Sequence, residues 1–159
     1  MIDETLFTEE TKRHFTRLYQ AAYGILRTRQ DAEDALQQAL VKAWAARAGG
    51  RADTFIPWLT RIVVNECRNI QRYRQRIVPS DTFAEEADPF HPPDIDLWHA
   101  VAALPDDLRV PFTLKYVTEL SEREVARATQ LPLYTVKNRL KKARKVLRES
   151  LSEWEVSFE

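Results

Sequence analysis

The sequence has very little cysteine and glycine, and both shortages limit the kinds of fold that the chain can adopt. Its 159 residues include one cysteine and three glycines. A single cysteine cannot form an internal disulfide, so a disulfide-stabilised fold is excluded and we expect Cys67 to be a reduced thiol in a core. The many alanine, leucine, arginine and glutamate residues are good helix formers. Together with the scarcity of glycine, they favour an all-α fold.

Long apolar runs and clustered metal ligands are also missing. No stretch approaches the roughly 18 apolar residues that a membrane-spanning helix needs, and no signal peptide opens the chain. The three histidines, His14, His91 and His99, lie apart, and there is no glycine-rich phosphate loop. We therefore expect a cytoplasmic protein without membrane insertion, metal, cofactor or catalytic activity of its own.

The net charge is zero, but the charges are unevenly distributed. Residues 77–96 hold six acids, four prolines and no base, without helical periodicity. Such a composition is typical of a flexible linker. Residues 1–76 hold thirteen basic and nine acidic side chains, and residues 97–159 hold eleven and nine. This distribution predicts two small helical domains, residues 1–76 and 97–159, joined by a flexible acidic linker at 77–96.

Apolar residues at helical spacing predict three helices in the first block. The first runs from about Glu9 to Arg27, the second opens with Asp31 as its N-cap, and the third begins near Thr54. On the second helix the side opposite the apolar positions carries acidic, amide and apolar side chains: Asp34, Gln37, Gln38 and Val41. From the residues alone, this outer face is either solvated or a contact surface.

The third helix of the first block is basic. Its arginines alternate with amides and a tyrosine, as in Asn65, Arg68, Asn69, Arg72 and Tyr73. Basic side chains mixed with amides and aromatics suit contact with a nucleic-acid backbone and with unstacked bases. The alternative is a basic helix end that is simply solvated.

The second block contains a helix-turn-helix pattern. Ser121 and Glu124 form a predicted capping box, and the turn at 131–133 leads into a strongly basic helix. On that helix the apolar residues form one stripe, and Asn138, Lys141, Lys142 and Lys145 lie opposite. We expect this second helix to bind DNA in the major groove. A solvated surface or a target for a partner protein are the alternatives.

Three stretches together resemble the extracytoplasmic-function (group 4) sigma factors of the sigma-70 family, the bacterial initiation subunits of RNA polymerase. They are DAEDALQQALVKAW at 31–44, FIPWLTRIVVNECRNIQRYRQR at 55–76, and the segment from LPDDLRVPF to VLRESL at 104–151. Their order, and their separation by a linker, make the combined resemblance specific. It implies a non-enzymatic protein that binds core RNA polymerase and promoter DNA, with sigma region 2 at 1–76 and sigma region 4 at 97–159.

The resemblance also implies three sets of site residues. The polymerase-binding set is Asp34, Gln37, Gln38 and Val41. The set that melts and recognises the −10 element is Trp58, Arg61, Asn65, Arg68, Asn69, Arg72 and Arg74, with Asn65 capturing a flipped base. The set that binds the −35 element is Tyr134, Lys137, Asn138, Arg139, Lys141, Lys142, Arg144 and Lys145.

The chain departs from the family pattern at three places. Tyr134 stands where the family usually has glycine, and Asn138 where serine is more usual. Asparagine can bond bidentately to adenine, so we expect an altered −35 preference. The loop at Gly49 and Gly50 lacks the aromatic residue often found between the two region 2 helices.

Two other functions stay open, and an anti-sigma protein is a candidate partner. A sigma-like protein that only sequesters an anti-sigma factor would not need the continuous basic face. A helix-turn-helix repressor would not need the first block.

Overall fold

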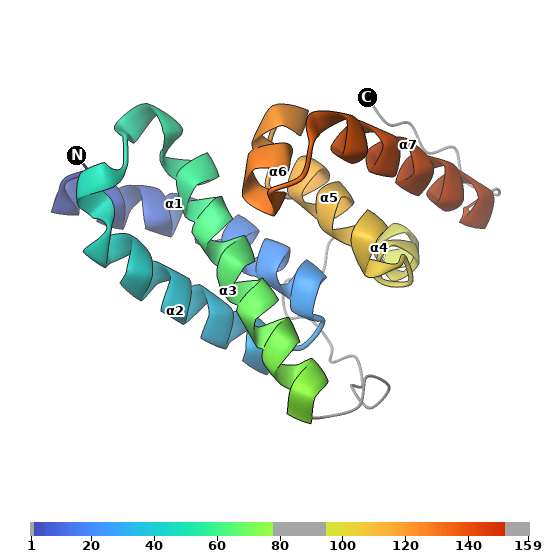
Figure 1. The fold of residues 1–159 in the computed structure, drawn as a ribbon, viewed down its shortest axis with the longest axis horizontal. Coiled ribbons are helices and arrows are strands. Elements are labelled where there is room, and N and C mark those ends of the chain that lie inside the picture. Colours follow the sequence, from blue (N-terminus) through green and yellow to red (C-terminus); the bar gives the residue numbers. More distant parts are fainter. Residues whose placement is uncertain (1, 78–94, 152–159) are drawn as a thin grey trace.

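The computed structural model describes residues 2–77 and 95–151, and every regular element within these ranges is helical. The first unit consists of α1 (Glu4–Leu26), α2 (Arg29–Ala45) and α3 (Phe55–Ile77), with two short 3-10 helices, Arg47–Gly49 and Ala52–Thr54, before α3. The second unit consists of α4 (Ile95–Ala102), α5 (Asp106–Tyr116), α6 (Glu122–Thr129) and α7 (Leu133–Ser150). The predicted all-α fold of two small helical units is confirmed (Figure 1).

The predicted linker lies mostly outside the described residues. Helices extend into both ends of the segment 77–96, because α3 includes Ile77 and α4 begins at Ile95. Residues 78–94 are not described.

A core of small and branched side chains holds the first unit together. Each helix contributes fully buried residues at helical spacing: Leu18, Ala21, Ala22 and Ile25 from α1, Ala32, Ala35, Leu36 and Ala39 from α2, and Leu59, Val63 and Val64 from α3. The alanines of α2 allow the helix backbones to approach closely. Cys67 is buried in this core, and the loss of hydration raises the pKa of its thiol. The predicted core thiol is confirmed.

Two helix starts differ from the predicted ones. The first helix begins at Glu4 rather than near Glu9, because an Asp3 carboxylate oxygen accepts a hydrogen bond from the Leu6 amide at 2.8 Å. The second begins at Arg29, with Thr28 rather than Asp31 as its N-cap. The Thr28 hydroxyl accepts from the Asp31 amide at 3.3 Å, which leaves the Asp31 carboxylate for an ion pair with α3.

The second unit contains the predicted helix-turn-helix. The Ser121 hydroxyl accepts from the Glu124 amide at 3.1 Å, and the Glu124 carboxylate accepts from the Ser121 amide at 2.9 Å, so the capping box is confirmed. After α6, Gln130 adopts a left-handed conformation with φ of 58°, and α7 follows at Leu133. The predicted apolar stripe of α7 is fully buried: Val136, Leu140, Ala143 and Leu147.

The two units pack directly against each other. Helix α5 lies on α1, and α6 lies on α3, as the neighbouring green and orange helices of Figure 1 show. No pattern in the sequence indicates this contact. It places the end of α6 beside the polar face of α3.

Candidate nucleic-acid and polymerase interfaces

The predicted −35 residues all lie on α7, and most of them are exposed. Six of the eight are exposed to solvent, opposite the buried stripe: Tyr134, Lys137, Asn138, Lys141, Lys142 and Lys145. Tyr134, in the first turn, has 70% of its surface exposed. Arg139 and Arg144 are only half-buried, and Arg144 donates a hydrogen bond to the Tyr116 hydroxyl of α5 at 3.4 Å. The sequence between Tyr134 and Arg148 has no acidic residue, so no carboxylate of this stretch lies among the exposed cations.

The dimensions of α7 suit a DNA groove. Its 18 residues extend about 27 Å at 1.5 Å per residue. The major groove of B-DNA is roughly 12 Å wide and admits an α-helix. An amphipathic helix that buries one side and exposes amines and an amide on the other can therefore bind phosphates and base edges together.

The predicted −10 residues lie along α3, but their side chains differ in accessibility. Arg61, Asn65, Asn69 and Arg72 are exposed, and the Arg72 guanidinium donates to the Asn69 side-chain oxygen. Trp58 is half-buried, with its ring 5.9 Å from that of Phe55. Amides and guanidinium groups on one helix side can bind both phosphates and base edges.

Two further arginines of the −10 set are paired with carboxylates. Arg74 forms an ion pair with Asp31, whose side chain is only 5% exposed in the first turn of α2. The N-terminal dipole of α2 and the guanidinium both favour this buried carboxylate. Arg68 pairs with Asp106 of the second unit at 2.8 Å. The Arg74–Asp31 ion pair therefore links α3 to α2. The Arg68–Asp106 ion pair links the first unit to the second.

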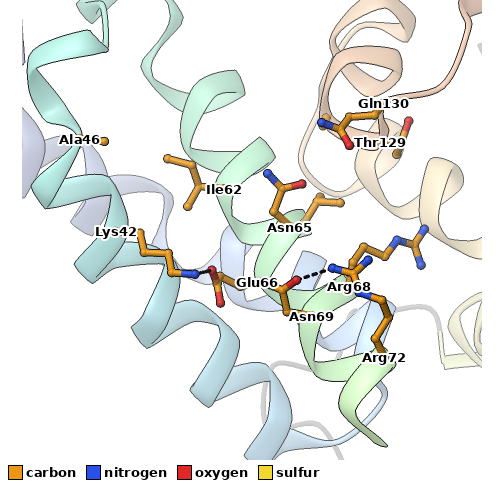
Figure 2. Close-up of a pocket in the computed structure, with 12 residues that line it drawn as sticks. Lys42, Ala46, Ile62, Asn65, Glu66, Arg68, Asn69, Arg72, Thr129 and Gln130 are labelled. Carbon is orange, nitrogen blue, oxygen red and sulfur yellow. Dashed lines mark hydrogen bonds and ion pairs between the residues drawn. The ribbon is translucent and has the colours of Figure 1, made fainter. Parts of the chain in front are cut away.

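A cavity of about 550 Å³ lies between α3, the end of α2 and the end of α6. It is lined by Lys42, Ala46, Ile62, Val64, Asn65, Glu66, Arg68, Asn69, Arg72, Ala128, Thr129 and Gln130. Figure 2 shows Asn65 on α3 across from Thr129 and Gln130, with Lys42 of α2 paired to Glu66. No sequence pattern could have indicated this cavity, since it exists only because the two units are docked.

The predicted polymerase-binding residues form one exposed side of α2. Asp34, Gln37, Gln38 and Val41 are all exposed, and Val41 has 61% of its surface in solvent. Sequence reasoning missed Trp44, three residues after Val41 and 37% exposed. The Arg47 guanidinium lies 3.8 Å from the Trp44 ring centroid, and the Phe7 ring packs edge-on at 5.2 Å. An exposed valine followed at helical spacing by a tryptophan was the signal available in the sequence.

Within residues 2–77 and 95–151, no group of three histidine, cysteine or acidic side chains could hold a metal ion. Among the helices of those same ranges, none is long and apolar enough to cross a membrane.

Comparison with known proteins gives matches for both units. The family model for sigma-70 region 2 matches residues 11–77, and the model for sigma-70 region 4 matches residues 94–147. The RNA polymerase sigma-H factor of Pseudomonas aeruginosa is 32% identical over 142 residues, which are 77% of this chain and 74% of that protein. The ECF RNA polymerase sigma-E factor of Escherichia coli K12 is 32% identical over 137 residues, covering 74% and 72% of the two chains.

A solved structure is similar over both units. It is the sigma factor RpoE in complex with the anti-sigma factor NepR from Bartonella quintana. The TM-score is 0.78 at 27% identity, with 92% of this chain and 96% of that chain covered.

Proposed function

The chain belongs to the extracytoplasmic-function sigma factors of the sigma-70 family, and we propose that its two units recognise the two elements of a promoter while bound to core RNA polymerase. One observation carries the proposal: a basic face on α7 and a polar, basic face on α3 belong to separate units. Each unit matches a different region of the family. Two recognition surfaces on one chain suit two separated DNA elements.

Helix α7 would bind the −35 duplex. Its exposed lysines would neutralise phosphates and set the register, while Asn138 and Tyr134 would contact base edges. Asn138 can hydrogen-bond both N6 and N7 of adenine, so we propose an adenine preference at the base pair it contacts.

Helix α3 would take up the unpaired strand of the −10 element. Asn65 would hydrogen-bond a base turned out of the stack, and the exposed arginines Arg61 and Arg72 would hold the backbone. Trp58, Arg68, Asn69 and Arg74 complete the proposed set. The ion pair of Arg74 with Asp31 would keep the end of α3 in place while the strand binds.

The outer face of α2 would dock on core polymerase. Val41 and Trp44 offer apolar area at its centre, and Asp34, Gln37 and Gln38 offer polar contacts at its rim. The phosphodiester chemistry would belong to the polymerase, so the chain itself is proposed to be non-catalytic and to act in the cytoplasm. We also propose an anti-sigma protein as a partner, because the similar RpoE was solved in complex with the anti-sigma factor NepR.

Transcription with purified components tests the proposed function. Core RNA polymerase supplied with this chain is expected to start transcripts at discrete positions on genomic DNA fragments from the source organism. The control is core polymerase alone, which should give no such starts. If no fragment yields a start that depends on the chain, the proposed function is wrong. A repressor or an anti-sigma decoy would give that negative result.

Asn65 tests the −10 assignment. The Asn65→Ala variant is expected to lower open-complex formation by roughly 5- to 150-fold, which is the effect of losing about 1–3 kcal/mol of hydrogen bonding to a base. Asn65 is exposed, so the fold should be unaffected. Permanganate reactivity of unpaired thymines at the −10 element measures the opening. The exposed Gln75→Ala variant on the same helix is the control, and equal opening by both variants would remove Asn65 from base recognition.

A further inference from the structure

Two large apolar side chains at the end of α3 are exposed and belong to none of the three proposed surfaces. Tyr73 and Ile77 each have 58% of their surface in solvent. Within residues 2–77 and 95–151, the Tyr73 side chain has no hydrogen bond and no ring contact. The last turn of α3 extends past the second unit in Figure 1, so the packing between the units does not cover it. This turn is therefore accessible to a partner.

The polar side of α3 consists of two neighbouring ridges. Residues four apart form the first ridge, which begins with two amides and ends with the two apolar side chains: Asn65, Asn69, Tyr73 and Ile77. The second ridge consists of arginines that stand three residues after members of the first: Arg68, Arg72 and Arg76. Residues 68–77 contain no acidic residue. A row of amides and apolar groups therefore lies beside a row of cations.

The arginines alone have a structural explanation, but the exposed ring does not. Positive side chains near the C-terminal end of a helix interact favourably with the helix dipole. Arg74 also pairs with Asp31 of α2. The Tyr73 ring gains nothing from either effect. A planar ring beside guanidinium groups suits a single nucleic-acid strand, because its bases stack on the ring and its phosphates bind the cations.

The spacing of Asn65 and Tyr73 fits a strand that follows α3. Eight residues of helix advance by about 12 Å, at 1.5 Å per residue. A stacked strand advances by about 3.4 Å per nucleotide. A base on the Tyr73 ring is therefore about three or four nucleotides from the base at Asn65.

We propose that Tyr73 stacks on an unpaired base of the DNA strand, an inference that rests on the proposed function of α3. Arg72 and Arg76, which are exposed on the neighbouring ridge, hold the phosphates beside that base. Every base has a π-face, so the ring adds affinity for the strand without selecting a sequence. Tyr73 thus extends strand binding from the amides of α3 to the end of the helix.

Paired substitutions at Tyr73 test the stacking. Tyr73→Leu keeps an apolar side chain but removes the π-face, so the full chain should bind a fluorescent dT oligonucleotide of about 20 nucleotides at least about five-fold more weakly, measured by anisotropy. Tyr73→Phe keeps the ring and is expected to bind as tightly as the wild type.

The matched control is Phe15→Leu, which removes an exposed ring from α1 and should leave the affinity unchanged. Both positions are exposed, so the fold should be unaffected. Equal affinities of Tyr73→Leu and Tyr73→Phe, an equal loss in Phe15→Leu, or no binding by the wild type would each overturn the proposal.

Photo-crosslinking locates the contact independently of affinity. The same oligonucleotide with one 5-iododeoxyuridine is irradiated in complex with the wild-type chain, and crosslinked residues are identified by mass spectrometry. A crosslink at Tyr73 is expected, because the halogenated base reacts with an aromatic ring that is stacked on it. Crosslinks at other residues only would contradict stacking at Tyr73.

These measurements are separate from transcription. If Tyr73→Leu binds the oligonucleotide as tightly as Tyr73→Phe while transcripts form, the stacking is wrong and the proposed function stands. If Tyr73→Leu loses oligonucleotide binding but the wild-type chain gives no transcript, the stacking stands and the proposed function is wrong. A loss of affinity for core polymerase without DNA, with oligonucleotide binding unchanged, would make this turn of α3 a protein contact and overturn the stacking.

Discussion

Reversing the charge of Lys141 and Lys142 together is expected to abolish binding to the −35 element while leaving binding to core RNA polymerase unchanged. Both side chains are exposed on α7, opposite the stripe that packs into the second unit. A charged hydrogen bond to phosphate contributes about 1.5–3 kcal/mol. Losing two such bonds, and adding two repulsive carboxylates, should weaken promoter binding by at least about 100-fold.

The measurement is duplex binding by the holoenzyme over a series of salt concentrations. Each lost phosphate contact lowers the slope of log affinity against log salt by about 0.9, so the slope should fall by nearly 2 for Lys141→Glu with Lys142→Glu. The matched control reverses Lys12 and Arg13, which are exposed on α1. If polymerase binding falls as much as promoter binding, the assignment of separate tasks to the two units is wrong.

Introducing a charge at Val41 is expected to have the second large effect, the loss of polymerase binding. Val41 lies at the centre of the exposed side of α2, between Gln37 and Trp44. A carboxylate placed there would be buried in the proposed interface without a partner. Truncations or charges at such central positions cost 2 kcal/mol or more, so Val41→Glu should weaken polymerase binding by about 30-fold or more.

Val41→Glu should leave the folded chain intact, because the Val41 side chain is 61% exposed. Affinity for core polymerase is measured by competition with a labelled wild-type chain. Val41→Ala should give a smaller loss, and Thr16→Glu, an exposed position on α1, should give none. A Val41→Glu variant that binds polymerase as tightly as Thr16→Glu would show that this side of α2 is solvated surface.

Features of a single helix were predictable when the residues that determine them lie within that helix. The buried stripe of α7 and the capping box of α6 each depend only on residues of one helix and its N-cap. The N-cap of α2 was predicted incorrectly at Asp31. Threonine and aspartate are both common N-cap residues, so local preference does not separate Thr28 from Asp31. In the structure Thr28 is the cap, and Asp31 pairs with Arg74, which is 43 residues away.

The candidate site also combines features that depend on neighbouring residues with features that depend on residues distant in the sequence. The sequence alone was sufficient to predict an all-α chain of two helical units, with an amphipathic basic helix in the second, because helical periodicity and charge are local properties. Which arginines of α3 are engaged, and by what, was decided by tertiary structure. Arg109 reaches carbonyls 84 and 85 residues earlier in the chain, and Asp106 holds Arg68 from 38 residues away. Such contacts depend on how the two units pack against each other. Gly24 of α1 permits the close packing, because a Cβ at this position would meet the side chain of Thr113 in α5.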